Sequence, residues 1–113
     1  MIMPISTDMK TKMKIDIKPE QFKIVQSILK KHLSEDTKVF VFGSRAKNCA
    51  RMFSDLDLLL HAKKPLSMQL MADLAFDFEE SDLPWTVDLV DWMCASDAFR
   101  NNMASQYVEI EFD

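Results

Sequence analysis

The sequence predicts a single α/β (α+β) domain, a small mixed β-sheet with flanking helices. Three short runs of β-branched, aromatic and leucine residues predict strands, and segments with apolar residues at helical spacing lie around them. The chain has 113 residues, and 48% of them are apolar, which is enough for one modest core. We expect one domain over residues 1–113, with residues 1–13 loosely attached, and the order of the strands stays open.

The first predicted elements are a helix and a strand. Pro19 suits the first turn of a helix. Val25 and Leu29 are among the apolar residues that recur at helical spacing, which predicts an amphipathic helix over residues 19–33. The sequence Lys-Val-Phe-Val-Phe at residues 38–42 predicts a buried strand.

Two more strands and a helix are predicted further along. Residues 55–60 combine two aspartates with a run of leucines, which predicts a strand. Residues 66–80 carry apolar side chains on one helical face, and Ser-Asp-Leu-Pro at 81–84 ends that helix. Residues 85–92 predict the third strand.

A final helix is predicted near the carboxyl end. Ser96 and Asp97 are residue types that cap a helix, and Phe99, Met103 and Tyr107 follow at intervals of four. This spacing predicts that the three aromatic and methionine side chains share one helical face.

Gly43 is the single glycine of the chain, and it follows directly after the strand at 38–42. The residues after it favour a helix, so the chain must turn sharply there, and a side chain would crowd the turn. The first N–H groups of a helix have no internal partner and form a seat for an anion. The Ser44 hydroxyl can add a hydrogen bond to a phosphate held there. Arg45 either supplies charge to the same group or is a solvated surface arginine.

Asp55 and Asp57 follow Gly43 and Ser44 at the spacing Gly-Ser-x10-Asp-x-Asp, which is the signature of a nucleotidyltransferase site. Side chains alternate along a strand, so both carboxylates project from one face with Cα atoms roughly 6.6 Å apart. Two carboxylates at the start of an apolar strand repel each other unless a cation lies between them. We expect them to hold divalent metal ions.

A third carboxylate is expected on the strand at 85–92, because two-metal phosphoryl transfer needs ligands from more than one direction. Asp88 and Asp91 are three residues apart and therefore face opposite sides of a regular strand. Asp88 sits mid-strand, where an unpaired carboxylate is costly, whereas Asp91 is near the end and easily solvated. We choose Asp88 as the third ligand, with Asp91 as the alternative.

Three segments together resemble the core elements of a known family: Gly43-Ser44-Arg45-Ala46, Ser54-Asp55-Leu56-Asp57-Leu58 and Val87-Asp88-Leu89-Val90. They look like those of the DNA polymerase beta-like nucleotidyltransferase superfamily, and the short chain resembles its minimal nucleotidyltransferases (MNT). The resemblance implies the polymerase beta-like fold, ATP as substrate and two Mg²⁺ ions. One departure is that similar proteins often have a glycine after the Arg-Ala pair, where this chain has Lys47-Asn48-Cys49. Asn48 tolerates left-handed backbone angles and can take that place.

We expect a mechanism in which each of these residues has a separate role. Gly43 and Ser44 hold the outer phosphates of the nucleotide. Asp55 and Asp57 bind the Mg²⁺ that chelates the triphosphate, and with Asp88 they bind a second Mg²⁺. Asp88 is also placed to accept the proton of the attacking hydroxyl.

The acceptor must come mostly from outside the chain, because no residues remain for a second domain. The resemblance implies a hetero-oligomer with a small helical HEPN toxin, in which this chain is the antitoxin and transfers AMP to a tyrosine of its partner. Two alternatives stay open. One is an antitoxin that acts by binding alone, and the other is a transferase for a small molecule such as an aminoglycoside, completed by a dimer.

Composition limits which partners and which cellular compartment the protein can have. The net charge of −4 argues against sequence-independent nucleic-acid binding, which relies on a basic surface. Cys49 and Cys94 lack metal-ligand spacing and are too few for a disulfide framework, which suits a reducing cytoplasm. No apolar run is long enough for a signal peptide or a membrane span, so we expect a cytoplasmic protein.

Overall fold

The computed structural model describes residues 15–46, 54–102 and 107–111. The expected loose attachment of residues 1–13 lies outside these ranges. The elements run in the order α2 (Pro19–His32), β1 (Lys38–Phe42), the 3-10 turn η1 (Gly43–Arg45), β2 (Leu56–His61), α3 (Met68–Glu79), β3 (Val87–Asp91), the 3-10 turn η2 (Trp92–Cys94), α4 (Asp97–Asn102) and β4 (Tyr107–Ile110).

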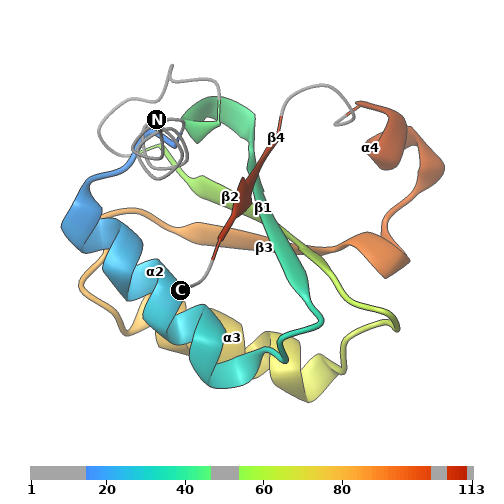
Figure 1. Cartoon of the computed structure of the whole chain (residues 1–113), viewed down its shortest axis with the longest axis horizontal. Helices are drawn as coiled ribbons and strands as arrows, with labels where there is room; N and C mark the ends of the chain where they lie inside the picture. The colour runs from blue at the N-terminus through green and yellow to red at the C-terminus, as the bar shows by residue number, and fades with distance from the viewer. Residues whose placement is uncertain (1–14, 47–53, 103–106, 112–113) are drawn as a thin grey trace, which may run out of the picture.

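The strands form one sheet in the order β3-β2-β1-β4. β1 runs antiparallel to both β2 and β4, whereas β2 and β3 run parallel. Figure 1 shows α2 and α3 side by side below the sheet and α4 on its other side. The predicted mixed sheet with flanking helices is therefore confirmed, and the structure supplies the strand order that the sequence left open.

One side of the sheet, which we call the helical face, packs against α2 and α3. Because side chains alternate along a strand, every second residue of each strand points there. The core on this face includes buried residues of both helices and of three strands: Val25, Leu29, Val39, Val41, Leu56, Leu58, Leu60, Leu74, Phe78 and Ile110. A hydrogen bond of 2.6 Å between His32 Nε2 and Asp77 Oδ2 joins the two helices at their outer side.

The other side of the sheet, which we call the open face, carries the alternate residues of the same strands. They are Phe40 and Phe42 of β1, Asp57, Leu59 and His61 of β2, Asp88 and Val90 of β3, and Tyr107 and Glu109 of β4. α4 packs on part of it, where the rings of Phe42 and Phe99 meet edge to face with centroids 5.5 Å apart. The functional candidates Asp57 and Asp88 therefore share a face that the two long helices do not cover.

The structure corrects two predictions about helices. The helix expected to carry Phe99, Met103 and Tyr107 ends at Asn102, and Tyr107 begins strand β4 instead. Met103 lies outside the described residues. Residues 107–110, Tyr-Val-Glu-Ile, alternate as in a strand and pair with β1 at the edge of the sheet. This pairing outweighs the helical spacing of Phe99, Met103 and Tyr107. The helix expected after Gly43 is a single 3-10 turn.

Candidate active site

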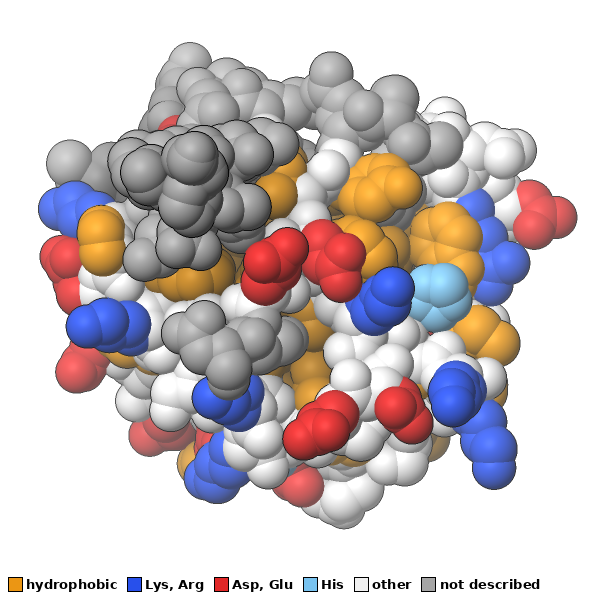
Figure 2. Space-filling model, viewed as in Figure 1, with side chains coloured by type: hydrophobic (Ala, Val, Ile, Leu, Met, Phe, Trp, Pro, Cys, Tyr) orange, Lys and Arg blue, Asp and Glu red, His pale blue; other side chains and the backbone are white. Residues whose placement is uncertain are grey.

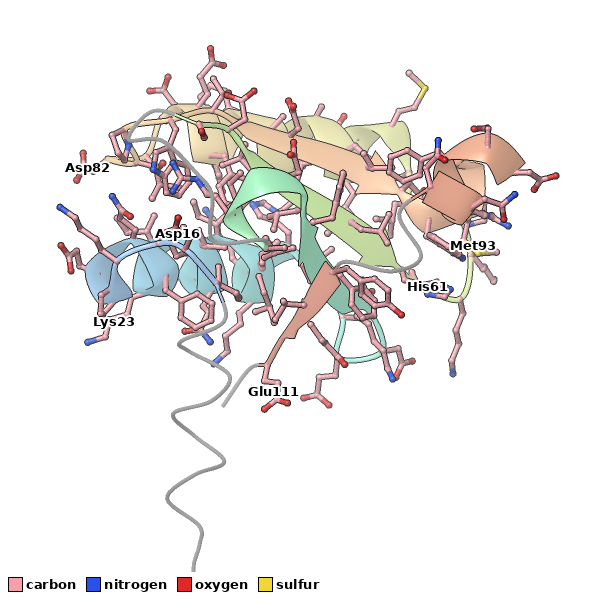
Figure 3. The ribbon with its side chains drawn as sticks, turned by 90° about the horizontal axis from the view of Figure 1, so that it is seen from above. Asp16, Lys23, His61, Asp82, Met93 and Glu111 are labelled. Carbon is pink, nitrogen blue, oxygen red and sulfur yellow. The ribbon has the colours of Figure 1, made fainter. Side chains whose placement is uncertain are left out.

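Three chain segments meet at one end of the open face. The end of β1 lies beside the starts of β2 and β3, because β1 is antiparallel to β2 and β2 is parallel to β3. The register pairs Phe42 with Asp57 and Asp57 with Asp88. Figure 3 shows the molecule from above, with Asp82, just before β3, toward one end and His61, at the end of β2, toward the other. The sheet thus brings together the motif residues that the sequence separates by up to 45 positions.

Gly43 is the turn between β1 and η1. Its φ of 77° lies in the left-handed region that residues with a side chain rarely adopt. A Cβ built on it would collide with Oδ2 of Asp57 and lie 3.3 Å from the Asp57 Cγ. Both the backbone angle and the close approach of Asp57 therefore require glycine, so the predicted sharp turn is confirmed and gains a second cause.

Asp57 and Asp88 are direct cross-strand partners on the open face. The pKa of Asp57 is raised to about 6, first by burial, then by the charges of Asp88 and Asp55, and by a hydrogen bond to the Asp88 side chain. Asp57 is half-buried, whereas Asp88 and Asp55 are exposed. The charge of Asp57 is therefore unfavourable in its half-buried position beside Asp55 and Asp88.

Asp55 lies just before β2 and is oriented by a residue that the sequence analysis did not single out. Thr86 Oγ1 donates a 2.5 Å hydrogen bond to Oδ1 of Asp55, and the Leu56 N–H donates to the Thr86 carbonyl at 2.9 Å. Thr86 is two residues before Asp88 and shares its parity, which is the signal that could have found it. Thr86 thus links the carboxylate before β2 to the strand that carries Asp88.

Arg45 does not lie on the surface, so the prediction of a solvated surface arginine is wrong. It is 4% exposed, its Nε and Nη2 donate to the Ser54 carbonyl at 3.1 and 2.7 Å, and its Nη1 donates to the Asp16 carbonyl at 2.7 Å. Its guanidinium carbon lies 4.5 Å from the centre of the Trp85 ring. Burial lowers the pKa of Arg45, and the charges of Asp16 and Asp55 oppose that shift. These contacts tie the η1 turn to the residue before Asp55 and to the start of β3.

Asp91, the alternative third ligand, faces away from the site. It is buried, and its carboxylate accepts hydrogen bonds from the backbone N–H groups of Leu66 at 2.8 Å and Met93 at 3.0 Å. The expectation that Asp91 is easily solvated and Asp88 enclosed is therefore wrong, because the chain folds back over the end of β3. The parity argument nevertheless separates the two correctly, and it is Asp88 that neighbours Asp57.

The carboxylate group suits a hard divalent cation in its chemistry. Oxygen ligands of Asp55, Asp57 and Asp88 are the type that Mg²⁺ prefers. The pKa of Asp57 is raised first by burial and then by the neighbouring charges, and a cation would offset both effects. Within the described residues, no three histidine, cysteine, aspartate or glutamate side chains lie close enough together to hold a metal ion by themselves. A cation here would also take oxygens from the substrate's phosphates, as Mg²⁺ usually does. The side chain of Ser44 and the Asn48 segment lie outside what the structure describes.

The comparisons with known proteins agree with this geometry. The family model "Polymerase beta, Nucleotidyltransferase" matches residues 23–110. A Haemophilus influenzae protein named as a probable protein adenylyltransferase, MntA, is 44% identical over 97 residues, which cover 86% of this chain and 84% of that protein. In the part of the chain that the structure describes, no helix has the length and apolar character needed to cross a membrane.

Solved structures share the fold at low sequence identity. A toxin–antitoxin complex with AMP-PNP matches with a TM-score of 0.67 and 23% identity, covering 81% of this chain and 73% of that one. A MntA–HepT toxin–antitoxin complex gives a TM-score of 0.62 at 21% identity, with 85% and 74% covered. A complex of the tri-AMPylated Shewanella oneidensis HEPN toxin with MNT antitoxin gives 0.56 at 23%, with 81% and 73% covered. The predicted polymerase beta-like fold is confirmed.

Proposed function

The chain belongs to the polymerase beta nucleotidyltransferase family, and we propose that it is an antitoxin that transfers AMP from ATP to a hydroxyl of a HEPN toxin partner. The observation that carries this proposal is the convergence of Asp55, Asp57 and Asp88 beside the Gly43 turn. The 44% identity to a probable protein adenylyltransferase supports AMP as the transferred group and protein as the acceptor.

Binding of the nucleotide falls to the turn between β1 and β2. Gly43 lets the Asp57 carboxylate approach the η1 turn, and Ser44 follows it in the motif that we assign to the outer phosphates. Arg45 is held beneath this turn by backbone carbonyls and Trp85, so we assign it to positioning the turn. Contact of Arg45 with phosphate remains a prediction from the sequence.

The three carboxylates are proposed to hold two Mg²⁺ ions together with the triphosphate. Asp55 and Asp57 would hold one ion, and Asp88 would join them in holding the other. When bound, Mg²⁺ neutralises phosphate charge and lowers the pKa of an attacking hydroxyl. Asp88 is exposed at the margin of the group, where it can accept the proton of an incoming hydroxyl.

The acceptor is proposed to be a tyrosine of a folded protein, with which this chain forms a hetero-oligomer. The described residues form one small sheet with its helices and supply no second lobe to cradle a small acceptor. Figure 2 shows acidic and basic side chains interspersed on the face in view, and the net charge is −4, so neither favours a nucleic-acid acceptor. We propose the cytoplasm as the compartment, because that is where ATP and such a partner meet.

The test is transfer from α-labelled ATP to the purified partner toxin in Mg²⁺. We expect label on the partner with the wild-type chain, none with Asp57→Asn, and full transfer with Asp36→Asn. Asp36 is an exposed carboxylate paired with Lys63 at 3.6 Å, away from the site, and is the matched control. Binding of partner without labelling would instead support an antitoxin that acts by binding alone. Labelling of an aminoglycoside by a homodimer would support the small-molecule reading.

A further inference from the structure

Tyr107 is the single tyrosine of the chain, and the structure places it on the open face. It is 46% exposed at the start of edge strand β4. Val108 and Ile110, the residues of opposite parity, pack with the core on the helical face. Tyr107 therefore presents a phenol on the same side of the sheet as the acidic site.

The strand register puts Tyr107 in one row with the site. Tyr107 pairs with Phe42, Phe42 with Asp57, and Asp57 with Asp88, so the row crosses all four strands (Figure 1). Neighbouring strands lie about 4.8 Å apart, which puts the Cα atoms of Tyr107 and Asp57 about 10 Å apart. A tyrosine side chain and a bound α-phosphate above Asp57 together span a gap of this size.

The chemistry of Tyr107 suits an acceptor. A phenol is a weak acid, and its hydroxyl loses a proton more readily than an aliphatic hydroxyl does. The hydroxyl of Thr86, which also lies at the site, already donates to Asp55. The ring of Tyr107 rests edge to face against Phe40, with centroids 5.2 Å apart. Transfer requires the exposed ring to rotate about χ1 from Phe40 toward the site, and rotations of exposed side chains are fast compared with catalysis.

We propose that Tyr107 is an AMP acceptor for its own chain. This rests on the proposed AMP-transfer activity and goes beyond it by naming a second acceptor. The phenolic oxygen of Tyr107 forms a bond to the α-phosphorus of ATP, the bond from that phosphorus to the pyrophosphate oxygen breaks, and pyrophosphate leaves. The phenolic proton passes to a carboxylate of the site, and the product is a tyrosine–AMP phosphodiester.

The modification has a consequence for the site. The adduct fixes a nucleotide and one negative charge on the open face, two strands from Asp57. A chain so modified carries its own AMP group on the face that bears the carboxylates of the site. Self-transfer therefore lowers transfer to the partner when no partner occupies the open face.

The experiment incubates the purified chain with Mg²⁺ and α-labelled ATP, first alone and then with the partner toxin. Intact mass and peptide mapping then locate the label. We expect the wild-type chain alone to gain one AMP on Tyr107. We expect at least tenfold less label in Tyr107→Phe, which keeps the ring against Phe40, and no label in Asp57→Asn. Label on another residue, or equal label in Tyr107→Phe, overturns the proposal.

Two further arms separate this inference from the proposed function. If Tyr107→Phe and wild type both label the partner but the wild-type chain alone gains no AMP, only the self-transfer fails. If neither partner nor chain is labelled, the proposed function itself fails. A mixture of active Tyr107→Phe with Asp57→Asn supplies Tyr107 on an inactive chain only. We expect that chain to stay unlabelled, and label on it would overturn transfer within one chain.

Discussion

The helical face and the open face of the sheet use the same strands for different purposes. On β2, Leu56, Leu58 and Leu60 are fully buried under α2 and α3, whereas Asp57 between them points to the other side with a raised pKa. Because side chains alternate along the strand, adjacent residues lie in different environments, one in the core and the next on the open face. The helical face holds most of the buried core, and the open face holds the half-buried charge of Asp57.

The largest expected difference between the faces is in activity. Asp57→Asn keeps the size of the side chain but removes a ligand and a charge at the centre of the acidic group. Loss of an outer partner of a metal site typically costs 10–100-fold, so loss of this ligand should cost more than about 100-fold in AMP transfer. Single-turnover labelling of the partner measures it. Residual transfer within tenfold of wild type would show that Asp57 is not in the reaction.

The next residue on β2 should show the opposite pattern. Leu58 is 0% exposed within the core, so Leu58→Ala should lower the free energy of unfolding by about 2–5 kcal/mol. Urea unfolding measures the loss, and transfer per folded molecule should stay near that of wild type. A cost below about 1 kcal/mol would contradict the assignment of this face to the core.

Gly43→Ala tests the contact between the Gly43 turn and Asp57. The positive φ alone should cost about 1–3 kcal/mol, and the added Cβ must displace the Asp57 carboxylate. We therefore expect lower stability and much reduced transfer. Combining it with Asp57→Ala, which removes the colliding oxygens, should recover part of the lost stability. Strictly additive free energies of unfolding would show that the two positions do not touch.

Thr86 offers a smaller test on the open face. Thr86→Val keeps the shape of the side chain and removes the hydrogen bond to Asp55, so transfer should fall about tenfold. Thr86→Ser should restore most of it, because the hydroxyl returns. Thermal unfolding should change little in either variant. Equal activity of the Val and Ser variants would assign Thr86 no part in orienting Asp55.

The sequence predicted the proximity of Gly43, Asp57 and Asp88 better than it predicted the elements near the carboxyl end. Residue type and spacing single out four candidates: Gly43, Asp55, Asp57 and Asp88. The alternation of side chains along a strand is enough to choose Asp88 over Asp91. The burial of Asp91 was not predictable, because it depends on hydrogen bonds from Leu66, between β2 and α3, and from Met93 in η2. Burial of a side chain is a property of the tertiary structure and not of the strand alone.

Arg45 and Tyr107 show where sequence reasoning fails. The partners that bury Arg45 include the Asp16 carbonyl and Trp85, which are far away in the chain, so no local pattern reveals them. Tyr107 follows Phe99 at a multiple of four, which imitates a helical face. The competing signal was the alternation of residues 107–110, and pairing with β1 decided between the two.

The smallest predicted difference between the two faces is in how the free energy of unfolding depends on pH. The pKa of Asp57 is about 6 in the folded chain, above the value of 3.8 for a free Asp. Its protonated form therefore stabilises the fold below about pH 4, and this contribution is lost as the pH rises to about 6. After allowance for partial exposure the effect is about 1 kcal/mol. In Asp57→Asn, the free energy of unfolding should not fall over this pH range.

The most direct test of the claim that the open face holds a cation site is thermal unfolding at pH 7.5 with and without millimolar Mg²⁺. Wild type, Asp57→Asn and the exposed control Asp36→Asn are compared. Without Mg²⁺, Asp57→Asn should melt a few degrees above wild type, because it lacks the buried repulsion. Mg²⁺ should raise the Tm of wild type and Asp36→Asn but not of Asp57→Asn. An equal Mg²⁺ shift in all three proteins, or a lower Tm for Asp57→Asn without Mg²⁺, would contradict it.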